Sequence, residues 1–257
     1  EKKSSLDLNE GYGVQLSANG VSILNKIGFR DLKVYNKFNP KKVDFYSLKN
    51  NNKICDLNIS QFNSKDVSYT TLKRSLLIGF LKEKIKVPFG VNVLWDPIST
   101  IAVAAATGAQ FVREIFSGVY TSDMGLWIPD AAKALRYKKS LDRNDLLMFY
   151  NVSAEFAYSL DQRSLADRSR SVVFSSIPDA VLVSGQITGE AAKIDDIESV
   201  KKVLPDTPVL ANTGVKLETV TNILKIADGV IVGSSLKVNG DTWKPIDPKR
   251  AFDFMNK

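Results

Sequence analysis

The sequence predicts an α/β fold, a (β/α)8 barrel in which eight parallel strands are each followed by a helix. The chain has 257 residues, close to the roughly 250 that one such barrel needs. From residue 87 onward, short apolar runs typical of buried strands alternate six times with segments of helical periodicity. The chain before residue 87 has room for two more such pairs, and eight pairs favour a closed barrel over a doubly wound open sheet.

The first part of the chain is the least regular. Residues 1–12 are polar and lack periodicity, which predicts an N-terminal arm. Apolar residues at helical spacing predict a helix over residues 14–27, closed by Gly28 just after its last turn. Residues 32–35 are a candidate strand.

Residues 39–69 are rich in lysine and asparagine, and we interpret them as a variable insertion. Within them, three consecutive asparagines at 50–52 indicate a turn and residues 53–59 a short strand. Residues 70–84 carry leucines on one face and predict a helix. All of these elements are assigned, with the rest of the chain, to a single domain over residues 1–257.

The regular part of the chain consists of strand and helix pairs separated by loops. The six expected pairs are 89–94 with 100–107, 111–116 with 130–140, 146–152 with 165–176, 180–184 with 195–204, 209–211 with 217–226, and 229–232 with 247–254. The last helix has a clear start, because Asp247 at the N-cap is followed by Pro248 at the first helical position.

Small residues follow the last two expected strands. Gly214 comes after the first of them, and Gly233, Ser234 and Ser235 come after the second. In an eightfold barrel the loops after strands seven and eight usually form an anion site of backbone N–H groups and hydroxyls. The alternative is that the glycines only permit tight turns.

The composition is ordinary for a globular protein, with 44% apolar and 25% charged residues. The single cysteine, Cys55, excludes an intramolecular disulfide framework. No apolar run approaches the roughly 20 residues that span a bilayer, and no signal-peptide pattern opens the chain. We therefore expect a soluble protein, located in the cytoplasm, or in the mitochondrial matrix if the start at Glu1 reflects a removed transit peptide.

The net charge of +7 lies in the first third of the chain. Residues 1–90 contain 16 Lys and Arg against 8 Asp and Glu, whereas residues 91–257 contain 19 against 20. Such a basic surface can meet nucleic acid, an acidic protein or an anionic membrane. No recognition motif accompanies the charge, so a solvated surface rich in lysine and asparagine is the simpler interpretation.

The chain contains no histidine. Catalytic triads and zinc sites that use histidine are therefore excluded. Any proton transfer must use Asp, Glu, Lys, Tyr or Cys55.

Several long stretches resemble the BtpA family, and within it the SgcQ-like branch. They are PFGVNVLWDP, FVREIFSGVYTSDMGLW, DAVLVSGQITGE, DTPVLANTGVKLETV and ADGVIVGSSLKVNG, in order and correctly spaced. The resemblance implies a TIM barrel of the ribulose-phosphate-binding type. Members of the family are linked to photosystem I biogenesis and to sugar metabolism, so the resemblance specifies the fold better than the reaction.

Polar residues at the expected strand ends are the candidate site residues. Glu155, Asp96 and Glu114 are the candidate catalytic groups, with Glu155 the first choice as general base. The candidate substrate-orienting residues are Asn92, Arg113, Asp123 and Asn151. Arg113 and Glu114 are neighbours, so in an extended strand one should face the barrel interior and the other the helix layer.

A second group of small and hydroxyl-bearing residues is expected to form the phosphate side of the barrel mouth. This group comprises Ser184, Gly185, Thr188, Gly189, Asn212, Thr213, Gly214, Gly233, Ser234 and Ser235. We expect no metal among these residues, and no feature of the sequence identifies a cofactor.

The start of the chain departs from the family pattern. Nothing in residues 1–20 resembles the first strand of the family, and Asn36-Lys37 stands where the second strand usually ends in an asparagine and a glutamate. The first barrel strand is therefore degenerate or missing. Such a gap would expose unpaired backbone edges that another segment or chain must cover.

Two functions follow from these features. The first is a barrel that binds, and in the active case transforms, a phosphorylated small molecule of the sugar-phosphate or nucleoside-phosphate class. The alternative is a catalytically inactive barrel, a pseudoenzyme that serves as a structural or assembly subunit. Such a subunit would dock through basic residues 1–90 to a protein or ribonucleoprotein complex, including one in an organelle. The chain is also a candidate for forming oligomers. Direct nucleic-acid binding has only the charge in its favour.

Overall fold

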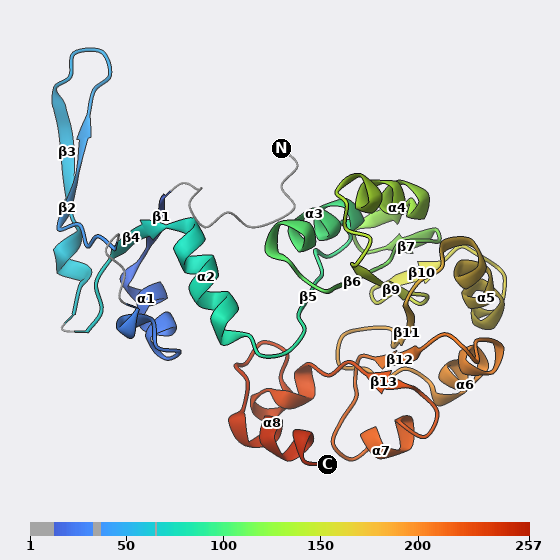
Figure 1. Ribbon diagram of the computed structural model, residues 1–257. Coiled ribbons are helices and arrows are strands. Elements are labelled where there is room, and N and C mark those ends of the chain that lie inside the picture. Colours follow the sequence, from blue (N-terminus) through green and yellow to red (C-terminus); the bar gives the residue numbers. More distant parts are fainter. Residues whose placement is uncertain (1–12, 33–36, 65) are drawn as a thin grey trace. The chain divides into compact units, whose positions relative to one another are not determined.

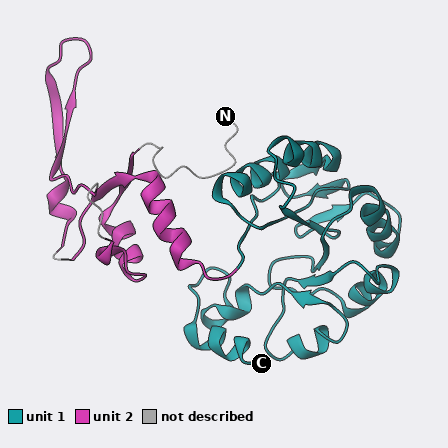
Figure 2. Cartoon of the chain, viewed as in Figure 1, with its two compact units in different colours: residues 1–4, 88–257 teal, residues 5–87 magenta. Residues whose placement is uncertain are grey.

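The structure, a computed structural model, describes residues 13–32, 37–64 and 66–257 (Figure 1). Contacts divide the chain between Val87 and Pro88 into two compact units (Figure 2). We call residues 88–257 the barrel unit and the described residues before Pro88 the N-terminal unit. The boundary lies where regular alternation of strands and helices was expected to begin. The single domain expected over residues 1–257 stays a prediction.

A six-stranded parallel sheet forms the centre of the barrel unit (Figure 1). Its strands, in spatial order, are β13 (Gly229–Val230), β12 (Val209–Asn212), β11 (Ala180–Ser184), β9 (Leu147–Asn151), β6 (Phe111–Glu114) and β5 (Gly90–Val91). The six strands predicted after residue 87 are therefore confirmed, although several are shorter than expected. Among the described residues, β5 and β13 are the edges of this sheet.

One helix follows each strand in the chain. The helices are α3 (Pro97–Thr107), α4 (Ala131–Ser140), α5 (Leu165–Ser176), α6 (Ile194–Val203), α7 (Val220–Ile223) and α8 (Pro248–Met255). They lie on the outer side of the curved sheet (Figure 1), as in a (β/α)8 barrel. The helix expected over residues 217–226 is reduced to the four residues of α7.

Alternation along the strands determines which side chains enter the barrel interior. Val112, Met148 and Tyr150 are fully or almost fully buried in a cluster with residues of α3 and α4. The residues that alternate with these three along β6 and β9 therefore point the other way. Phe111 and Phe149 stack with ring centroids 5.0 Å apart on that opposite face. The same alternation places Arg113 and Asn151 inside the barrel, near the carboxyl ends of their strands.

A small antiparallel sheet, not foreseen from the sequence, is built from the loops after β6 and β9. Its strands are β10 (Ala157–Ser159), β7 (Tyr120–Ser122) and β8 (Gly125–Trp127), with β7 in the centre. Tyr120 is buried against Ile115 and Ala154. The two loops therefore form a packed structure beside the strand ends.

The N-terminal unit has a different architecture from the two βα pairs for which the sequence had room. β1 (Gly13–Leu16) pairs antiparallel with β4 (Thr70–Lys73), and β2 (Lys42–Tyr46) pairs antiparallel with β3 (Lys53–Asn58). No strand among its described residues joins the parallel sheet. This arrangement agrees with the expectation that the first barrel strand is missing.

The helices of this unit start later than predicted. α1 (Ala18–Asn25) and α2 (Arg74–Lys84) are each preceded by a strand, because β1 and β4 use the first residues of the two segments expected to be helical. Two short 3-10 helices, Phe29–Asp31 and Ile59–Phe62, complete the unit. The arm expected over residues 1–12 lies outside the described residues, as does nearly all of the strand expected over residues 32–35.

A small core holds the N-terminal unit together. It consists of Val21, Phe29, Leu72 and Phe80, with the rings of Phe29 and Phe80 in an edge-to-face contact at 5.4 Å. Gly28 has a φ of 90° and lets the chain leave α1 toward this core. The predicted helix end at Gly28 is therefore close to the observed one.

Helix starts in the barrel unit depend on side-chain caps. Asp96 caps α3, accepting from the backbone N–H of Ser99 over 2.9 Å and from the Ser99 hydroxyl over 2.5 Å. These bonds, the hydroxyl bond first, lower the pKa of the Asp96 carboxyl below its usual value. Asp96 does not line either cavity of the barrel mouth. The structure therefore gives Asp96 a capping role, and its expected catalytic role stays a prediction.

Replacing Asp96 by Ala should lower the free energy of unfolding by about 1 kcal/mol, because the first turn of α3 loses its hydrogen-bond acceptor. Urea denaturation followed by circular dichroism measures this change. Asp123→Ala is the matched control, since Asp123 is exposed in the turn between β7 and β8. Equal midpoints for the two variants would contradict the capping role.

Candidate functional site

Two cavities lie where the strands of the barrel unit end. The smaller, of about 210 Å³, is lined by residues after β5, by residues at and just after the ends of β6 and β9, and by Thr188. The larger, of about 590 Å³, is lined by the loops after β12 and β13, by α8 and by Gly189. Thr188 and Gly189 are consecutive, so the loop after β11 borders both cavities. Both lie at the carboxyl ends of parallel strands, where barrel enzymes place their sites.

Arg113 is the cation of the small cavity. Its guanidinium donates from Nε to Oδ1 of Asn151 over 3.0 Å and from Nη2 to Oε1 of Glu155 over 3.1 Å. Both charged side chains are largely buried, with exposed fractions of 26% for Arg113 and 17% for Glu155. The barrel therefore compensates an internal positive charge with a carboxylate and an amide oxygen.

Glu155 is held from three directions. Besides Arg113, its Oε1 accepts from Nδ2 of Asn212 over 3.2 Å, and its Oε2 accepts from the Thr188 hydroxyl over 2.8 Å. A carboxylate with this many donors is well placed to orient other groups. Five of the expected site residues thus lie in one hydrogen-bonded group: Arg113, Asn151, Glu155, Thr188 and Asn212.

Ser184 lies beneath this group. Its hydroxyl oxygen accepts from Nδ2 of Asn151 over 2.8 Å and from Nδ2 of Asn212 over 2.7 Å. All three side chains are buried. Ser184 and Asn212, which the sequence placed with the phosphate, therefore support Glu155 and Arg113 and line neither cavity.

Glu114 lines the small cavity with only 2% of its surface exposed. One carboxylate oxygen accepts from the backbone N–H of Trp95 over 3.1 Å, and the other from Nδ2 of Asn92. Burial raises the pKa of Glu114 to about 7, although these hydrogen bonds and the charge of Arg113 oppose the shift. Glu114 is therefore a carboxyl group that can hold or release a proton near neutral pH.

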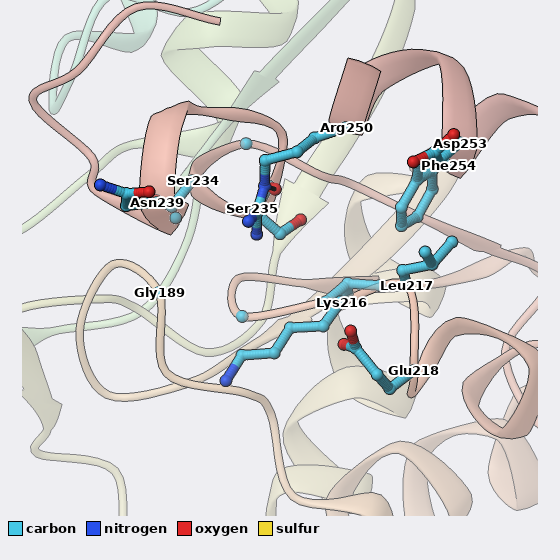
Figure 3. Close-up of a pocket in the computed structure, with 14 residues that line it drawn as sticks. Gly189, Lys216, Leu217, Glu218, Ser234, Ser235, Asn239, Arg250, Asp253 and Phe254 are labelled. Carbon is cyan, nitrogen blue, oxygen red and sulfur yellow. Dashed lines mark hydrogen bonds between the residues drawn. The ribbon is translucent and has the colours of Figure 1, made fainter. Parts of the chain in front are cut away.

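The large cavity is lined by two cations that the sequence analysis did not select. Lys216 follows β12, and Arg250 extends from α8 toward Ser235 (Figure 3). Arg250 donates from Nε to the backbone oxygen of Ser235 over 2.8 Å. Neither cation forms an ion pair with any residue that the structure describes. Their positions in the stretches NTGVK and DPKR were the only sequence signal for them.

Several residues that line this cavity also have backbone N–H groups without an acceptor among the described residues. Those of Gly214, Val215, Gly233, Ser234 and Ser235 have no acceptor within the described part of the chain. The Ser235 hydroxyl is buried without a hydrogen-bond partner in the same part of the chain. Unpaired donors of this kind require a ligand or water.

Other members of the expected phosphate group stabilise the loop after β11. The Thr213 hydroxyl accepts from the backbone N–H of Gly185 over 2.8 Å and donates to the backbone oxygen of Glu190 over 2.6 Å. A Cβ atom on Gly185 would lie 2.2 Å from that same oxygen, and one on Gly214 would lie 2.2 Å from the backbone nitrogen of Ala191. Another backbone segment packs on Gly185 and Gly214. Neither position therefore has room for a side chain.

The remaining candidates differ in position. Gly189, Gly214, Gly233, Ser234 and Ser235 line the large cavity, whereas Asn92 and Thr188 line the small one. Asp123 lies exposed outside both. Within the described ranges, no three cysteine or carboxylate side chains gather in a metal-binding arrangement. None of the helices among these residues has the length and apolar character needed to cross a bilayer.

The chain is similar in fold to a solved structure and similar in sequence to several known proteins. The N-(5'-phosphoribosyl)anthranilate isomerase of Pyrococcus furiosus matches with a TM-score of 0.47 at 18% identity, over 76% of this chain and 82% of that one. The sgc region protein SgcQ of Escherichia coli is 40% identical over 188 residues, 73% of this chain and 70% of SgcQ. The photosystem I biogenesis protein BtpA of Synechocystis sp. is 31% identical over 183 residues, 70% of this chain and 63% of BtpA.

A Caenorhabditis elegans protein whose name marks it as mitochondrial, F13E9.13, is 33% identical over 159 residues, 60% of this chain and 56% of that protein. The model of the BtpA family matches residues 61–257, a range that includes the whole barrel unit and both cavities. On this match, and on the identity to SgcQ and BtpA, the chain belongs to the BtpA family.

Proposed function

We propose that the barrel unit binds a phosphorylated small molecule, with the phosphate in the large cavity. One observation carries this proposal: two cations without an ion-pair partner among the described residues, Lys216 and Arg250, line the same cavity as several residues whose backbone N–H groups lack an acceptor there. Cations and backbone N–H donors together are the usual phosphate ligands in proteins. A dianionic phosphate would satisfy both kinds of group at once.

The phosphate is best placed at the border between the two cavities. A Cβ atom on Gly189 would lie 4.0 Å from the Ser234 hydroxyl, so these two residues lie close together where the loop after β11 meets the large cavity. Thr188, the residue before Gly189, lines the small cavity and donates to Glu155. A group attached to a phosphate at this border can therefore enter the small cavity and reach Arg113, Glu114 and Glu155.

Within the small cavity the two carboxyl groups have different tasks in our proposal. Glu155 carries its charge against Arg113 and orients the bound molecule, because its oxygens already accept three hydrogen bonds. Glu114 transfers the proton, because burial keeps its carboxyl protonated up to near neutral pH. The order of preference among the sequence candidates is thus reversed.

Replacing Lys216 or Arg250 by Gln should weaken the binding of inorganic phosphate and of ribose 5-phosphate. Each charged contact is worth roughly 1.5–3 kcal/mol, or about 10- to 100-fold in affinity. Calorimetric titration or a ligand-induced rise in Tm measures the loss. Lys202→Gln, the same change on the exposed surface of α6, is the control and should bind as the parent does. Parent-like binding by both cavity variants would contradict the placement of the phosphate.

The Glu114 carboxyl also predicts how stability depends on pH. Its pKa is 4.5 when unperturbed and about 7 in the folded chain, so the folded state binds the proton more tightly than the unfolded state. The resulting stabilisation is fully present below pH 4.5, falls as pH rises toward 7, and is lost above that value. A shift of this size corresponds to about 3 kcal/mol between pH 4.5 and pH 8.

Urea denaturation of the parent and of Glu114→Gln, at pH 5 and pH 8, tests this assignment. The parent should lose more stability than the variant over this interval, because glutamine has no proton to release. Other carboxyl groups contribute equally to both proteins and cancel in the comparison. The same pH dependence in both proteins would show that Glu114 titrates normally.

A second candidate function, a structural or assembly subunit, is favoured by the β2–β3 hairpin. The cross-strand pairs Val43 with Leu57 and Phe45 with Cys55 share one face. Phe45 and Leu57 are exposed to 49% and 46%. A two-stranded hairpin is marginally stable alone, and an exposed apolar face of this kind is typical of an interaction site.

If the hairpin docks a partner protein, the chain should migrate in native extracts of its source cells well above its own mass of 28.4 kDa. A double change, Phe45→Lys with Leu57→Lys, should release it to that mass. Leu126→Lys, at an apolar residue of β8 that is 61% exposed, is the control and should leave the migration unchanged. Migration of the parent as a free chain would argue against this second function.

A further inference from the structure

The large cavity is too large to serve a phosphate group alone. Its volume of about 590 Å³ falls within the range of roughly 300–1,000 Å³ typical of sites for whole small molecules. The phosphate proposed above occupies the side that borders the small cavity. The chemistry of the opposite side must therefore indicate which kind of molecule carries that phosphate.

An apolar wall forms part of this opposite side. Leu217, from the loop after β12, and Phe254, from α8, lie next to each other at the cavity (Figure 3). Phe254 also packs against the main core of the barrel unit, which holds its ring in place. A phosphate or a bare sugar phosphate gains little from such a wall, whereas a flat aromatic ring gains contact area and stacking energy.

A carboxylate also lines the cavity. Asp253 is paired with Lys249 at 2.5 Å, but Glu218 has no hydrogen-bond or ion-pair partner among the residues described. A free carboxylate repels a phosphate, so the exposed Glu218 is better suited to a hydrogen-bond donor elsewhere on the same ligand. Carboxylate oxygens accept hydrogen bonds, and the vicinal hydroxyls of a ribose are suitable donors.

We propose that the large cavity binds a nucleoside 5′-phosphate moiety. The phosphate contacts Lys216 and Arg250, ribose hydroxyls donate to Glu218, and the base lies against Leu217 and Phe254. This inference rests on the proposed phosphate site and specifies the ligand class within it. A substituent beyond the phosphate, as in a nucleoside diphosphate sugar, would extend toward Thr188 and the small cavity.

Calorimetric titration of the full chain with inorganic phosphate, ribose 5-phosphate, AMP and UMP tests the proposal. At least one nucleotide should bind about tenfold more tightly than ribose 5-phosphate, the gain expected from stacking one base. UDP-glucose, titrated in the same way, distinguishes a free nucleotide from a nucleotide sugar by whether it binds more tightly than UMP. Equal affinity for ribose 5-phosphate and both nucleotides would overturn the inference and leave the phosphate site standing.

Phe254→Leu separates the base contact from the phosphate contact. This variant should lose the preference for a nucleotide while keeping the parent's affinity for ribose 5-phosphate, because leucine fills the wall without offering a ring. Phe252→Leu, on the same helix and 69% exposed, is the matched control and should keep the preference. A Phe254→Leu protein that retains the full preference would overturn the inference. If no phosphate compound bound the parent at all, the proposed function itself would fail.

Discussion

The pairing of Arg113 inside the barrel is the constraint on which the site depends. The guanidinium of a side chain that is only 26% exposed needs acceptors within reach, and Glu155 and Asn151 provide them. Glu155 also accepts hydrogen bonds from Asn212 and Thr188. The hydrogen bonds of Arg113 and Glu155 therefore connect β6, β9, β12 and the loop after β11. The same network leaves Glu155 little freedom to act as a base. In the proposed reaction the proton chemistry therefore falls to Glu114, which accepts hydrogen bonds from Asn92 and from the backbone of Trp95.

Close backbone packing determines where the two cavities meet. The loop after β11 folds over Gly185, and its residue Glu190 lies against Gly214 so closely that neither glycine could carry a side chain without moving the backbone. Thr213 joins the two segments through its hydroxyl. This packing fixes Thr188 at one cavity and Gly189 at the other. The position of the border between the two cavities thus depends on residues that do not contact a ligand in our proposal.

The sequence predicted the fold of the barrel unit because its strands are local signals. The five residues of β11 are all buried, and such an apolar run can be recognised without a structure. Side-chain direction cannot be recognised in this way. Ser184 and Asn212 stand at strand ends, as phosphate ligands do, yet they point into the interior. Arg250 was missed because it reaches Ser235 only through a contact across 15 residues, and nothing local indicates such a contact.

The two cavities differ in how much they depend on the first two strands of a complete barrel, which the described residues do not provide. The large cavity is built from the ends of β12 and β13 and from α8, and the described chain provides all of these elements. One wall of the small cavity consists of Asn92, Leu94 and Trp95, which follow the edge strand β5. That edge is where the first two strands of a complete barrel would continue the sheet. The proposed phosphate site therefore requires only elements that the described residues provide, whereas the proposed proton transfer also depends on what covers the edge at β5. The proposed phosphate site is in this way independent of the proposed reaction.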